Sequence, residues 1–428
     1  MINYDFKNGD ISDIVNNIII YAVSKGASDI HFDPMEEGIK IRLRIDGLLE
    51  DHAIIPKEYE RNLITRIKLI SNMNITESRL PQDGAIKGII NGIDLDMRVA
   101  SLTTNLGEKI VIRILDYSQS TKGLENLGFT DENLKKIKKM MNVPNGIILV
   151  TGATGSGKTT TVYTMLQELN NKETNIITVE DPIEMNIEGI NQVQVNQEIG
   201  LTFGRVLRSI LREDPNIILI GEIRDSETAQ IAVRASITGH LVFSTLHTNN
   251  SLSTIERLLD MNVERYLLSS ALTGIISQKL ARRICPHCKK LRKTTPYERN
   301  IFKKVLDKDV LEIYDVDHSC DKCHGGYSGR IAIQEVLLLD DNIRDAIANP
   351  DTSRQKLREL VYTKNIKTLL QDGLEKVIEG ITTFDEIYKL IVIEDSVGMQ
   401  DDDDLQMLIE KGDVLQKTEV LDLGLLRK

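Results

Sequence analysis

Apolar residues follow two different patterns within the first 117 residues, one typical of helices and the other of strands. Apolar residues recur every three or four positions from Ile11 to Lys25 and again from Tyr59 to Ser71, which is the spacing of a helix with one buried face. Apolar and polar residues alternate instead in three stretches that we expect to be half-buried strands: Ile39 to Ile45, Ile93 to Val99, and Lys109 to Leu115. The segment Leu80 to Gly84 has the composition of a turn. Residues 1–117 are therefore predicted to form a small α/β domain.

The pattern changes after a polar, glycine-containing stretch, residues 118–128, which we predict to be a linker. Beyond it, apolar runs of strand length are separated by helix-compatible segments: Ile147 to Val150, Ile176 to Val179, Ile217 to Ile220, and Leu241 to Leu246. Such runs predict a parallel sheet with both faces covered by helices. This α/β domain is expected to span residues 129–395, with another strand at Ile331 to Leu339 and mostly helices after it. Residues 396–428 are predicted to be an acidic tail.

The segment Gly152 to Thr159 lies between the first apolar run and a predicted helix, Lys158 to Leu169. It fits the pattern G-x-x-x-x-G-K-[ST] in the strand, loop and helix context of a phosphate-binding loop. Backbone N–H groups would bind phosphate oxygens, Lys158 would reach the outer phosphates, and Thr159 would bind Mg²⁺. A chance match in an unrelated protein is the alternative. The predicted ATP-binding residues here are Gly152, Ala153, Thr154, Gly155, Ser156, Gly157, Lys158, Thr159 and Thr160.

Acidic and polar residues follow the other apolar runs, where parallel sheets bind their ligands. Glu180, Asp181 and Glu184 follow the second run, Glu222 follows the third, and His247 follows the fourth. A glycine stands before Glu222, where a Walker B strand usually has an aspartate. We therefore expect the three residues after the second run to share with Glu222 the work of holding Mg²⁺ and orienting the attacking water. The alternative is that these residues are helix caps and turn residues. The predicted catalytic residues are Lys158, Glu184 and Glu222.

Several arginines have two interpretations. Arg205, Arg208 and Arg212 lie three and four residues apart in the helix-compatible segment Phe203 to Glu213, so they are expected to share a face. Arg224 follows the third strand. An arginine at a γ-phosphate would stabilise transition-state charge, but the spacing alone favours a surface face of ion pairs. The pattern alone likewise favours solvated faces for the arginines of the N-terminal strands, Arg42, Arg44, Arg98 and Arg113.

All four cysteines lie in two C-x-x-C pairs, Cys285 with Cys288 and Cys320 with Cys323. Four thiolates in this pattern indicate a closed tetrahedral Zn²⁺ site, held by a small subdomain over residues 280–330. Redox-active or free thiols are the alternative. Three nearby histidines are possible further ligands, although four cysteines already complete the shell: His287, His318 and His324.

Length, charge and hydropathy exclude several classes of protein. A chain of 428 residues is too long for one typical core, so two or three domains are expected. The net charge of −11 argues against a protein whose main task is to grip a nucleic acid backbone. No apolar run is long enough to span a bilayer, and the N-terminus has no basic region leading into an apolar stretch. These features predict a protein of the reducing cytosol.

Together these segments resemble the secretion ATPase superfamily, the hexameric motors of type II secretion and type IV pilus assembly, over most of residues 10–395. The Gly221-Glu222 sequence is then that family's own Walker B pattern, and Ala153 replaces a frequent proline without disturbing the backbone cradle. The resembling motifs are Ala27 to Pro34, which opens the family's second N-terminal domain; Arg98 to Thr104 and Gly107 to Arg113, its arginine-bearing strands; Glu180 to Glu184, the Asp box; Gly221 to Asp225, the Walker B motif; and Gly239 to Asn249, the His box with His240 and His247.

The resemblance implies a RecA-like motor domain preceded by a small PAS-like α/β domain. It also implies that Arg98 and Arg113 contact nucleotide from the N-terminal domain, and that Arg208 and Arg212 lie near the phosphates. The cysteine pairs resemble the zinc module of the pilus-extension and type II secretion branches, which retraction ATPases lack, so retraction is not expected. The chain begins close to the second N-terminal domain, so the first domain, which often docks the motor or binds a cyclic dinucleotide, is expected to be absent.

The resulting prediction is a homohexameric, Mg²⁺-dependent ATPase with a structural Zn²⁺. It would convert ATP to ADP and phosphate and drive assembly of type IV pili or type II secretion pseudopili through an inner-membrane platform protein. We expect it in the cytoplasm, held at the inner face of the membrane by its partners, with no direct nucleic acid contact. The alternatives are a RecA-like nucleic-acid translocase, a competence pilus ATPase for DNA uptake, and a scaffold that binds ATP without hydrolysing it.

Overall fold

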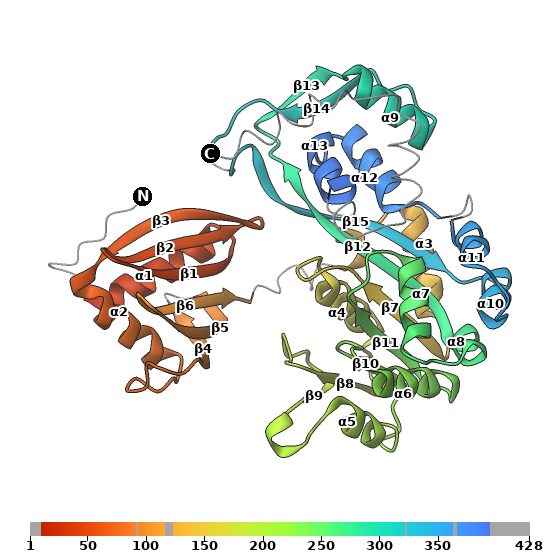
Figure 1. Ribbon diagram of the computed structural model, residues 1–428, viewed down its shortest axis with the longest axis horizontal. Coiled ribbons are helices and arrows are strands. Elements are labelled where there is room, and N and C mark those ends of the chain that lie inside the picture. The colour runs from red at the N-terminus through yellow and green to blue at the C-terminus, as the bar shows by residue number, and fades with distance from the viewer. Residues whose placement is uncertain (1–9, 91–92, 116–122, 322, 363–365, 394–428) are drawn as a thin grey trace. The chain divides into compact units, whose positions relative to one another are not determined.

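The structure, a computed structural model, describes residues 10–90, 93–115, 123–321, 323–362 and 366–393. Its chain forms two compact units, one ending at Thr121 and the other beginning at Lys122 (Figure 1). The predicted acidic tail and residues 118–122 of the predicted linker lie outside the described residues. Each unit is built around its own sheet.

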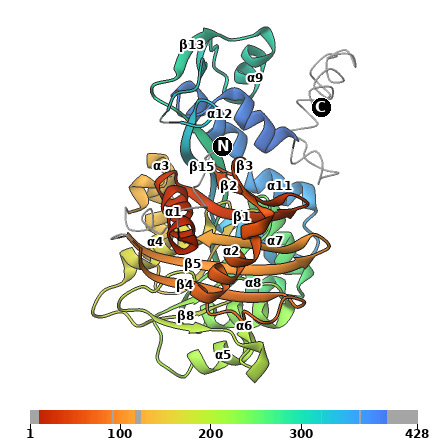
Figure 2. The same ribbon diagram turned by 90° about the vertical axis from the view of Figure 1, so that its left-hand side faces the viewer.

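The N-terminal unit has a six-stranded antiparallel sheet in the order β3-β2-β1-β6-β5-β4. Both of its helices lie on the same side of the strands (Figure 2). The elements of this unit are α1 (Ile11–Ser24), β1 (Ala27–Met35), β2 (Gly38–Ile45), β3 (Leu48–Pro56), α2 (Lys57–Ile70), β4 (Gln82–Ile90), β5 (Ile93–Thr104) and β6 (Gly107–Ile114).

Alternation along these strands places one apolar row against the helices. Ile110, Ile112 and Ile114 of β6 are buried in the same core as α1 and α2, whereas the intervening Arg113 is exposed. Asp10 begins α1 by accepting a hydrogen bond from the backbone N–H of Ser12. The unit therefore has one helix-covered apolar face and one polar sheet face.

The expected helices and the three expected strands of this unit are present, but the sequence pattern missed β1, β3 and β4. The predicted turn at Leu80 to Gly84 is partly wrong, because β4 begins at Gln82 and its residues pair with β5. Gly84 serves a close approach instead of a turn: a Cβ there would lie 2.3 Å from the carbonyl oxygen of Ser71.

The second unit has a seven-stranded sheet in the order β15-β12-β7-β11-β10-β8-β9. All neighbouring strands are parallel except β15, which is antiparallel to β12, so the predicted α/β fold with a parallel sheet is confirmed. The strands are β7 (Gly146–Thr151), β8 (Ile176–Glu180), β9 (Asn191–Gln194), β10 (Ile217–Ile220), β11 (Leu241–Leu246), β12 (Leu272–Ile284) and β15 (Tyr327–Leu338).

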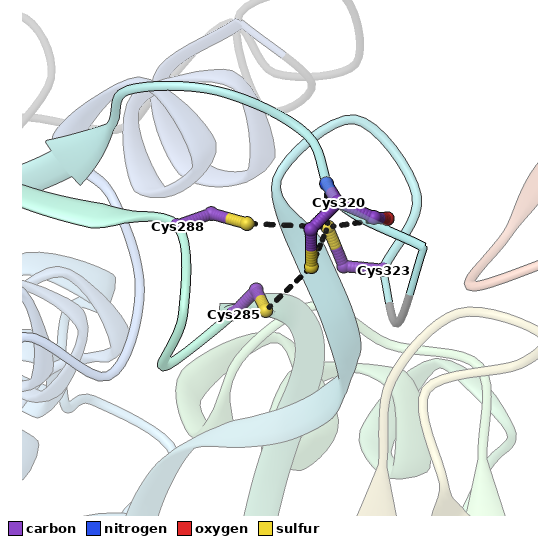
Figure 3. A group of neighbouring side chains, drawn as sticks. All are labelled: Cys285, Cys288, Cys320 and Cys323. Atoms are coloured by element: carbon purple, nitrogen blue, oxygen red, sulfur yellow. Dashed lines mark hydrogen bonds between the residues drawn. The ribbon is translucent and has the colours of Figure 1, made fainter.

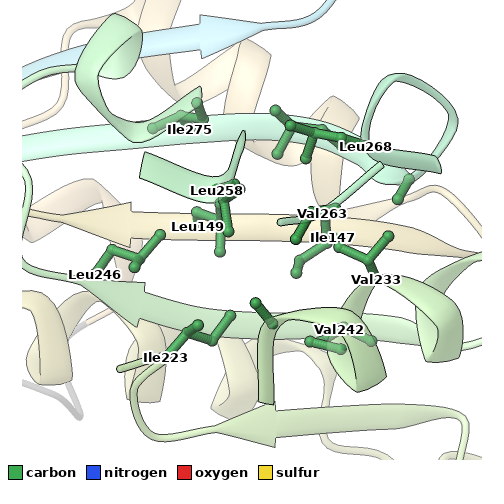
Figure 4. Close-up of a cluster of buried hydrophobic side chains, with 14 of the residues drawn as sticks. Ile147, Leu149, Ile223, Val233, Val242, Leu246, Leu258, Val263, Leu268 and Ile275 are labelled. Carbon is green, nitrogen blue, oxygen red and sulfur yellow. The ribbon is translucent and has the colours of Figure 1, made fainter. Parts of the chain in front are cut away.

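Helices cover both faces of this sheet, so successive residues of a strand enter different cores. Ile147 and Leu149 belong to a core shared with α5 (Phe203–Ile210), α6 (Ser226–Ile237), α7 (Ser251–Asp260) and α8 (Arg265–Ala271), as Figure 4 shows in part. Ile148 and Val150 pack instead with α3 (Asp131–Met141) and α4 (Lys158–Leu169). Burial on both faces explains why these strands are continuous apolar runs in the sequence.

Two strands continue past the sheet as a ribbon. β12 and β15 pair from Gly274 with Leu338 out to Ile284 with Tyr327, and the ribbon leads to a two-stranded module (Figure 1). The module contains β13 (Lys289–Lys293), α9 (Pro296–Leu306) and β14 (Glu312–Val316). The C-terminal elements are α10 (Asp341–Ala348), α11 (Arg354–Val361), α12 (Leu369–Ile378), α13 (Phe384–Ile387) and a π-helix, Tyr388–Ile393.

Candidate functional site

The predicted phosphate-binding loop connects β7 to α4. Gly157 directly precedes the helix with a φ of 88°, a left-handed conformation that favours glycine. Gly152 has no room for a side chain, since a Cβ would lie 2.3 Å from the carbonyl oxygen of Gln278. Thr159 is exposed at the start of α4. The loop therefore presents the N–H groups of a helix N-terminus, which can bind phosphate oxygens. It also presents a hydroxyl oxygen that can bind Mg²⁺.

Lys158 is held by the loop itself. Its Nζ donates hydrogen bonds to the carbonyl oxygens of Gly152, at 2.7 Å, and Ala153, at 3.0 Å. Burial lowers the pKa of Lys158, and the negative charge of Glu222 partly opposes that shift. The lysine is thus a buried cation whose pKa also responds to the charge of Glu222.

Glu222, at the end of β10, lies between two basic side chains. One carboxylate oxygen is 2.5 Å from Arg224, and the other is 3.2 Å from Nε2 of His247, which follows β11. Only 13% of the Glu222 side chain is exposed. Its hydrogen bond and charge raise the pKa of Arg224. Three residues that the sequence placed at neighbouring strand ends or just after them are therefore brought together at one edge of the sheet.

Glu180, at the end of β8, is buried and fully hydrogen bonded. One oxygen accepts from Thr178, at 2.6 Å, and from the side-chain amide of Gln192, at 3.0 Å. The other accepts from the hydroxyl of Tyr163 on α4. Burial, followed by the Glu180 charge, raises the pKa of Tyr163 above its ordinary range, so the phenol stays protonated. In this arrangement Glu180 connects the sheet to the helix of the phosphate loop.

Tyr163 is a site residue that the sequence analysis missed. Its hydroxyl also accepts a hydrogen bond from the backbone N–H of Glu184, at 3.2 Å, so it fixes the predicted Asp box at two points. Asp181, between those points, is exposed. A tyrosine among the apolar residues Val162, Met165 and Leu166 of a predicted helix was the available signal, because a buried phenol needs a polar partner.

The structure places the predicted arginines in two units. Arg208 lies in α5 and forms an ion pair of 2.5 Å with Glu227, and both side chains are more than half exposed. Arg212 lies beyond the end of α5 and donates to the carbonyl oxygen of Arg208, at 2.8 Å. In the N-terminal unit, Arg98 and Arg113 are directly opposite each other on β5 and β6, and Arg113 pairs with Asp29 at 3.0 Å.

The two histidines of the His box lie at opposite ends of β11. His247 follows the carboxyl end and contacts Glu222, whereas His240 precedes Leu241 at the amino end. The Nδ1–H group of His240 donates a hydrogen bond to the carbonyl oxygen of Ala235, at 2.9 Å. Six residues of strand separate the two histidines by about 20 Å, so His240 is not part of the strand-end cluster within one chain.

The four cysteine sulfurs converge at the end of the β12–β15 ribbon (Figure 3). All four Sγ atoms lie within 4.8 Å of one another, and three pairs are 3.9, 3.5 and 3.6 Å apart. Tetrahedral coordination at a Zn–S distance of 2.3 Å would separate sulfurs by about 3.8 Å, so these residues fit a Zn²⁺ ion. None of the three histidines is needed to complete this set of ligands.

The sequence of this chain matches a known protein family. The model of the family described as "Type II/IV secretion system protein" matches residues 6–389. The chain belongs to this family. It is 43% identical over 378 residues to a Vibrio cholerae protein named type II secretion system ATPase E, covering 88% of this chain and 74% of that protein. It is 44% identical to the type IV pilus assembly ATPase PilB of Thermus thermophilus, covering 87% of this chain and 42% of that protein.

Solved structures of a pilus motor and of an ATPase share the fold. The pilus retraction motor PilT with bound ADP superimposes with a TM-score of 0.61 at 26% identity, covering 91% of this chain and 98% of that chain. The Legionella pneumophila ATPase DotB superimposes with a TM-score of 0.67 at 21% identity, over 91% and 98% of the two chains. Across the described part of the chain, every helix is too short or too polar to cross a bilayer.

Proposed function

We propose that this chain is an ATPase that drives the assembly of type IV pilus or type II secretion pseudopilus filaments. The observation that carries the proposal is that the phosphate loop with Lys158 follows β7, while Glu222 and His247, which contact each other, follow β10 and β11 at the same edge of the parallel sheet. Membership in the type II/IV secretion system family supports it. The four clustered cysteines, Cys285, Cys288, Cys320 and Cys323, favour a motor that assembles filaments over one that retracts them, as the sequence resemblance implies.

The proposed reaction is hydrolysis of ATP to ADP and phosphate. The phosphate loop and Lys158 would hold the β- and γ-phosphates, with the lysine exchanging its loop carbonyls for phosphate oxygens. Thr159 would hold Mg²⁺, which neutralises phosphate charge. Water would attack the γ-phosphorus, the bond to the bridging oxygen would break, and Glu222, oriented by Arg224 and His247, would accept the proton from water.

The remaining assignments are also proposals. Arg98, Arg113, Arg208 and Arg212 would stabilise phosphate charge, with the N-terminal pair acting across a domain or subunit boundary of a homohexamer. Glu184 and Asp181 would complete the Asp box around a buried, structural Glu180. The motor would work in the cytoplasm against an inner-membrane platform protein, with Zn²⁺ holding the cysteine module.

Phosphate release from Mg²⁺-ATP tests the enzyme. We expect Glu222→Gln to bind nucleotide but lose turnover by at least about 100-fold, since it removes the proton acceptor but keeps the shape. Glu312→Gln, an exposed glutamate on β14, is the matched control and should retain wild-type turnover. Wild-type turnover in Glu222→Gln would contradict the assignment.

Filament assembly tests the motor. In cells that depend on this chain, Glu222→Gln should abolish filaments, and the purified protein should form hexamers by native mass spectrometry. Stimulation of the ATPase by DNA but not by a cytoplasmic fragment of the platform protein would favour the nucleic-acid translocase instead. A chain that binds ATP without releasing phosphate would be the scaffold.

A further inference from the structure

Gln278 of β12 lies directly behind the phosphate loop. It is the first residue after Ser277, where the parallel pairing of β12 with β7 ends. Its side chain is 1% exposed, and both ends of its amide are used. Nε2 donates to the carbonyl oxygen of Ser156, at 2.8 Å, and Oε1 accepts from the hydroxyl of Thr161, at 2.9 Å.

These two contacts fix the two parts of the phosphate site. Ser156 belongs to the loop, and Thr161 belongs to the first turn of α4. In a trans peptide the N–H and C=O groups point in opposite directions. Because Gln278 holds the carbonyl group of Ser156, the N–H of Gly157 in the same peptide unit points away from β12. The loop amide is thereby oriented as a donor before any phosphate arrives.

The neighbourhood leaves little room for an alternative arrangement. A Cβ on Gly157 would lie 3.1 Å from Nε2 of Gln278, and one on Gly152 would lie 2.3 Å from the Gln278 carbonyl oxygen. Thr151 and Ser277, one residue before the loop and before Gln278, are also joined by a hydrogen bond of 3.0 Å between buried hydroxyls. The backbone and side chain of β12 therefore form the rear wall of the loop.

We propose that Gln278 is a positioning residue for nucleotide binding, which orients the phosphate loop and the start of α4 through one side-chain amide. This rests on the proposed function, because it assumes that ATP and ADP bind at the loop. Gln278 does not contact the nucleotide itself. Its preorganising effect should therefore appear in nucleotide affinity and KM more than in kcat.

A set of near-isosteric variants tests the proposal. Gln278→Leu removes both contacts, and Thr161→Val removes only the contact to α4. We expect Gln278→Leu to raise the Kd for Mg²⁺-ADP and the KM for ATP by about 10-fold or more, with kcat changed less than about threefold. Thr161→Val should raise both by a few-fold. The double variant should be no weaker than Gln278→Leu alone, because the two residues share one contact.

Gln334 supplies the matched control. It lies opposite Gln278 in the β12–β15 register, is equally buried, and donates to the carbonyl oxygen of Leu127 instead of the loop. Gln334→Leu should lower thermal stability without changing nucleotide affinity.

The outcomes separate positioning from core packing and from failure of the function itself. Equal ADP affinity in wild type, Gln278→Leu and Thr161→Val would overturn the proposal while leaving the ATPase intact. An equal loss of affinity in Gln334→Leu would also overturn it, since the effect would then follow from general destabilisation. A wild-type chain that binds no Mg²⁺-ADP would overturn the proposed function and this proposal together. If Gln278→Leu does not fold, Gln278→Glu replaces it, because glutamate can accept from Thr161 but cannot donate to Ser156.

Discussion

The two sheets of this chain carry their polar residues at different places. In β7, the neighbours Ile148 and Leu149 are both fully buried, because helices cover both faces. In β6, Ile112 is fully buried, but its neighbour Val111 is half-buried on a face shared with charged side chains. The parallel sheet therefore has to carry its chemistry at the strand ends, whereas the antiparallel sheet carries its polar groups on a face.

The polar face of the N-terminal sheet is organised by ion pairs. Asp29 pairs with Arg113, at 3.0 Å, and lies 3.7 Å from Arg44. Asp33 accepts from Arg42, at 2.6 Å, and from Lys109. Burial would raise the pKa of Asp33, but these two cationic donors lower it overall. A face of matched charges is stable in water, so nothing requires a helix to cover it.

The largest difference between the two sheets should appear in catalysis. Lys158→Ala should reduce phosphate release by at least about 100-fold, because it removes a buried cation from the strand-end site. Lys40→Ala, which removes a lysine paired with Asp51 at 2.6 Å on the N-terminal face, should retain most turnover. Turnover lost equally in both variants would mean that the face is as essential to the chemistry as the edge.

Adjacent substitutions should show the difference in burial. Ile148→Ala and Leu149→Ala should each lower the free energy of unfolding by about 2–5 kcal/mol, as should Ile112→Ala. Val111→Ala should lower it by less than about 1 kcal/mol, because its side chain is only half-buried. Calorimetry, with each substitution assigned to the transition of its own unit, measures these values. A cost for Val111→Ala that matches Ile112→Ala would indicate a covered face.

Removal of one hydroxyl tests how the strand ends are held. Tyr163→Phe should reduce turnover several-fold, because Glu180 and the backbone N–H of Glu184 each lose a buried partner, at a cost of about 1–3 kcal/mol in stability. Tyr327→Phe removes a comparable hydroxyl on the ribbon, which lies 2.9 Å from the hydroxyl of Thr383 at the start of α13, and should leave turnover unchanged. Steady-state kinetics on the two variants distinguish a positioning effect from a general loss of stability.

The smallest effect concerns His31, on the polar face of β1. Neither of its ring nitrogens has a hydrogen-bond partner within the described residues. Burial, and then the charge of Lys109, lower its pKa below the ordinary 6.5. The charged groups that also act on it are Asp29, Asp33 and Arg44.

An NMR titration of histidine-labelled protein, with His31→Gln to assign the signal, should give a midpoint below 6.5. Because the folded-state pKa is lowered, the contribution of His31 to stability is present above 6.5 and is lost as pH falls through the folded pKa. A midpoint above 6.5 would show that the two aspartates dominate burial on this face.

Much of the second unit was predictable from the sequence. The apolar runs at Ile217 to Ile220 and Leu241 to Leu246 coincide with β10 and β11. Strands that helices cover on both faces are buried at successive positions, so they are continuous apolar runs in the sequence. The N-terminal strands were harder to predict. β3, for example, carries Glu50 and Asp51 in succession, and β4 contains two glycines, so neither shows simple alternation.

The sequence by itself determined the residue types of the site, the order in which they occur, and the strand ends at which most of them lie. Motif spacing is a local property, and the short phosphate loop and C-x-x-C turns preserve it in three dimensions. Only the tertiary structure decided that the hydroxyl of Tyr163 binds Glu180, and that Gln278 supports the loop from a strand more than a hundred residues away. Such contacts depend on how strands order themselves in a sheet, which no local pattern encodes.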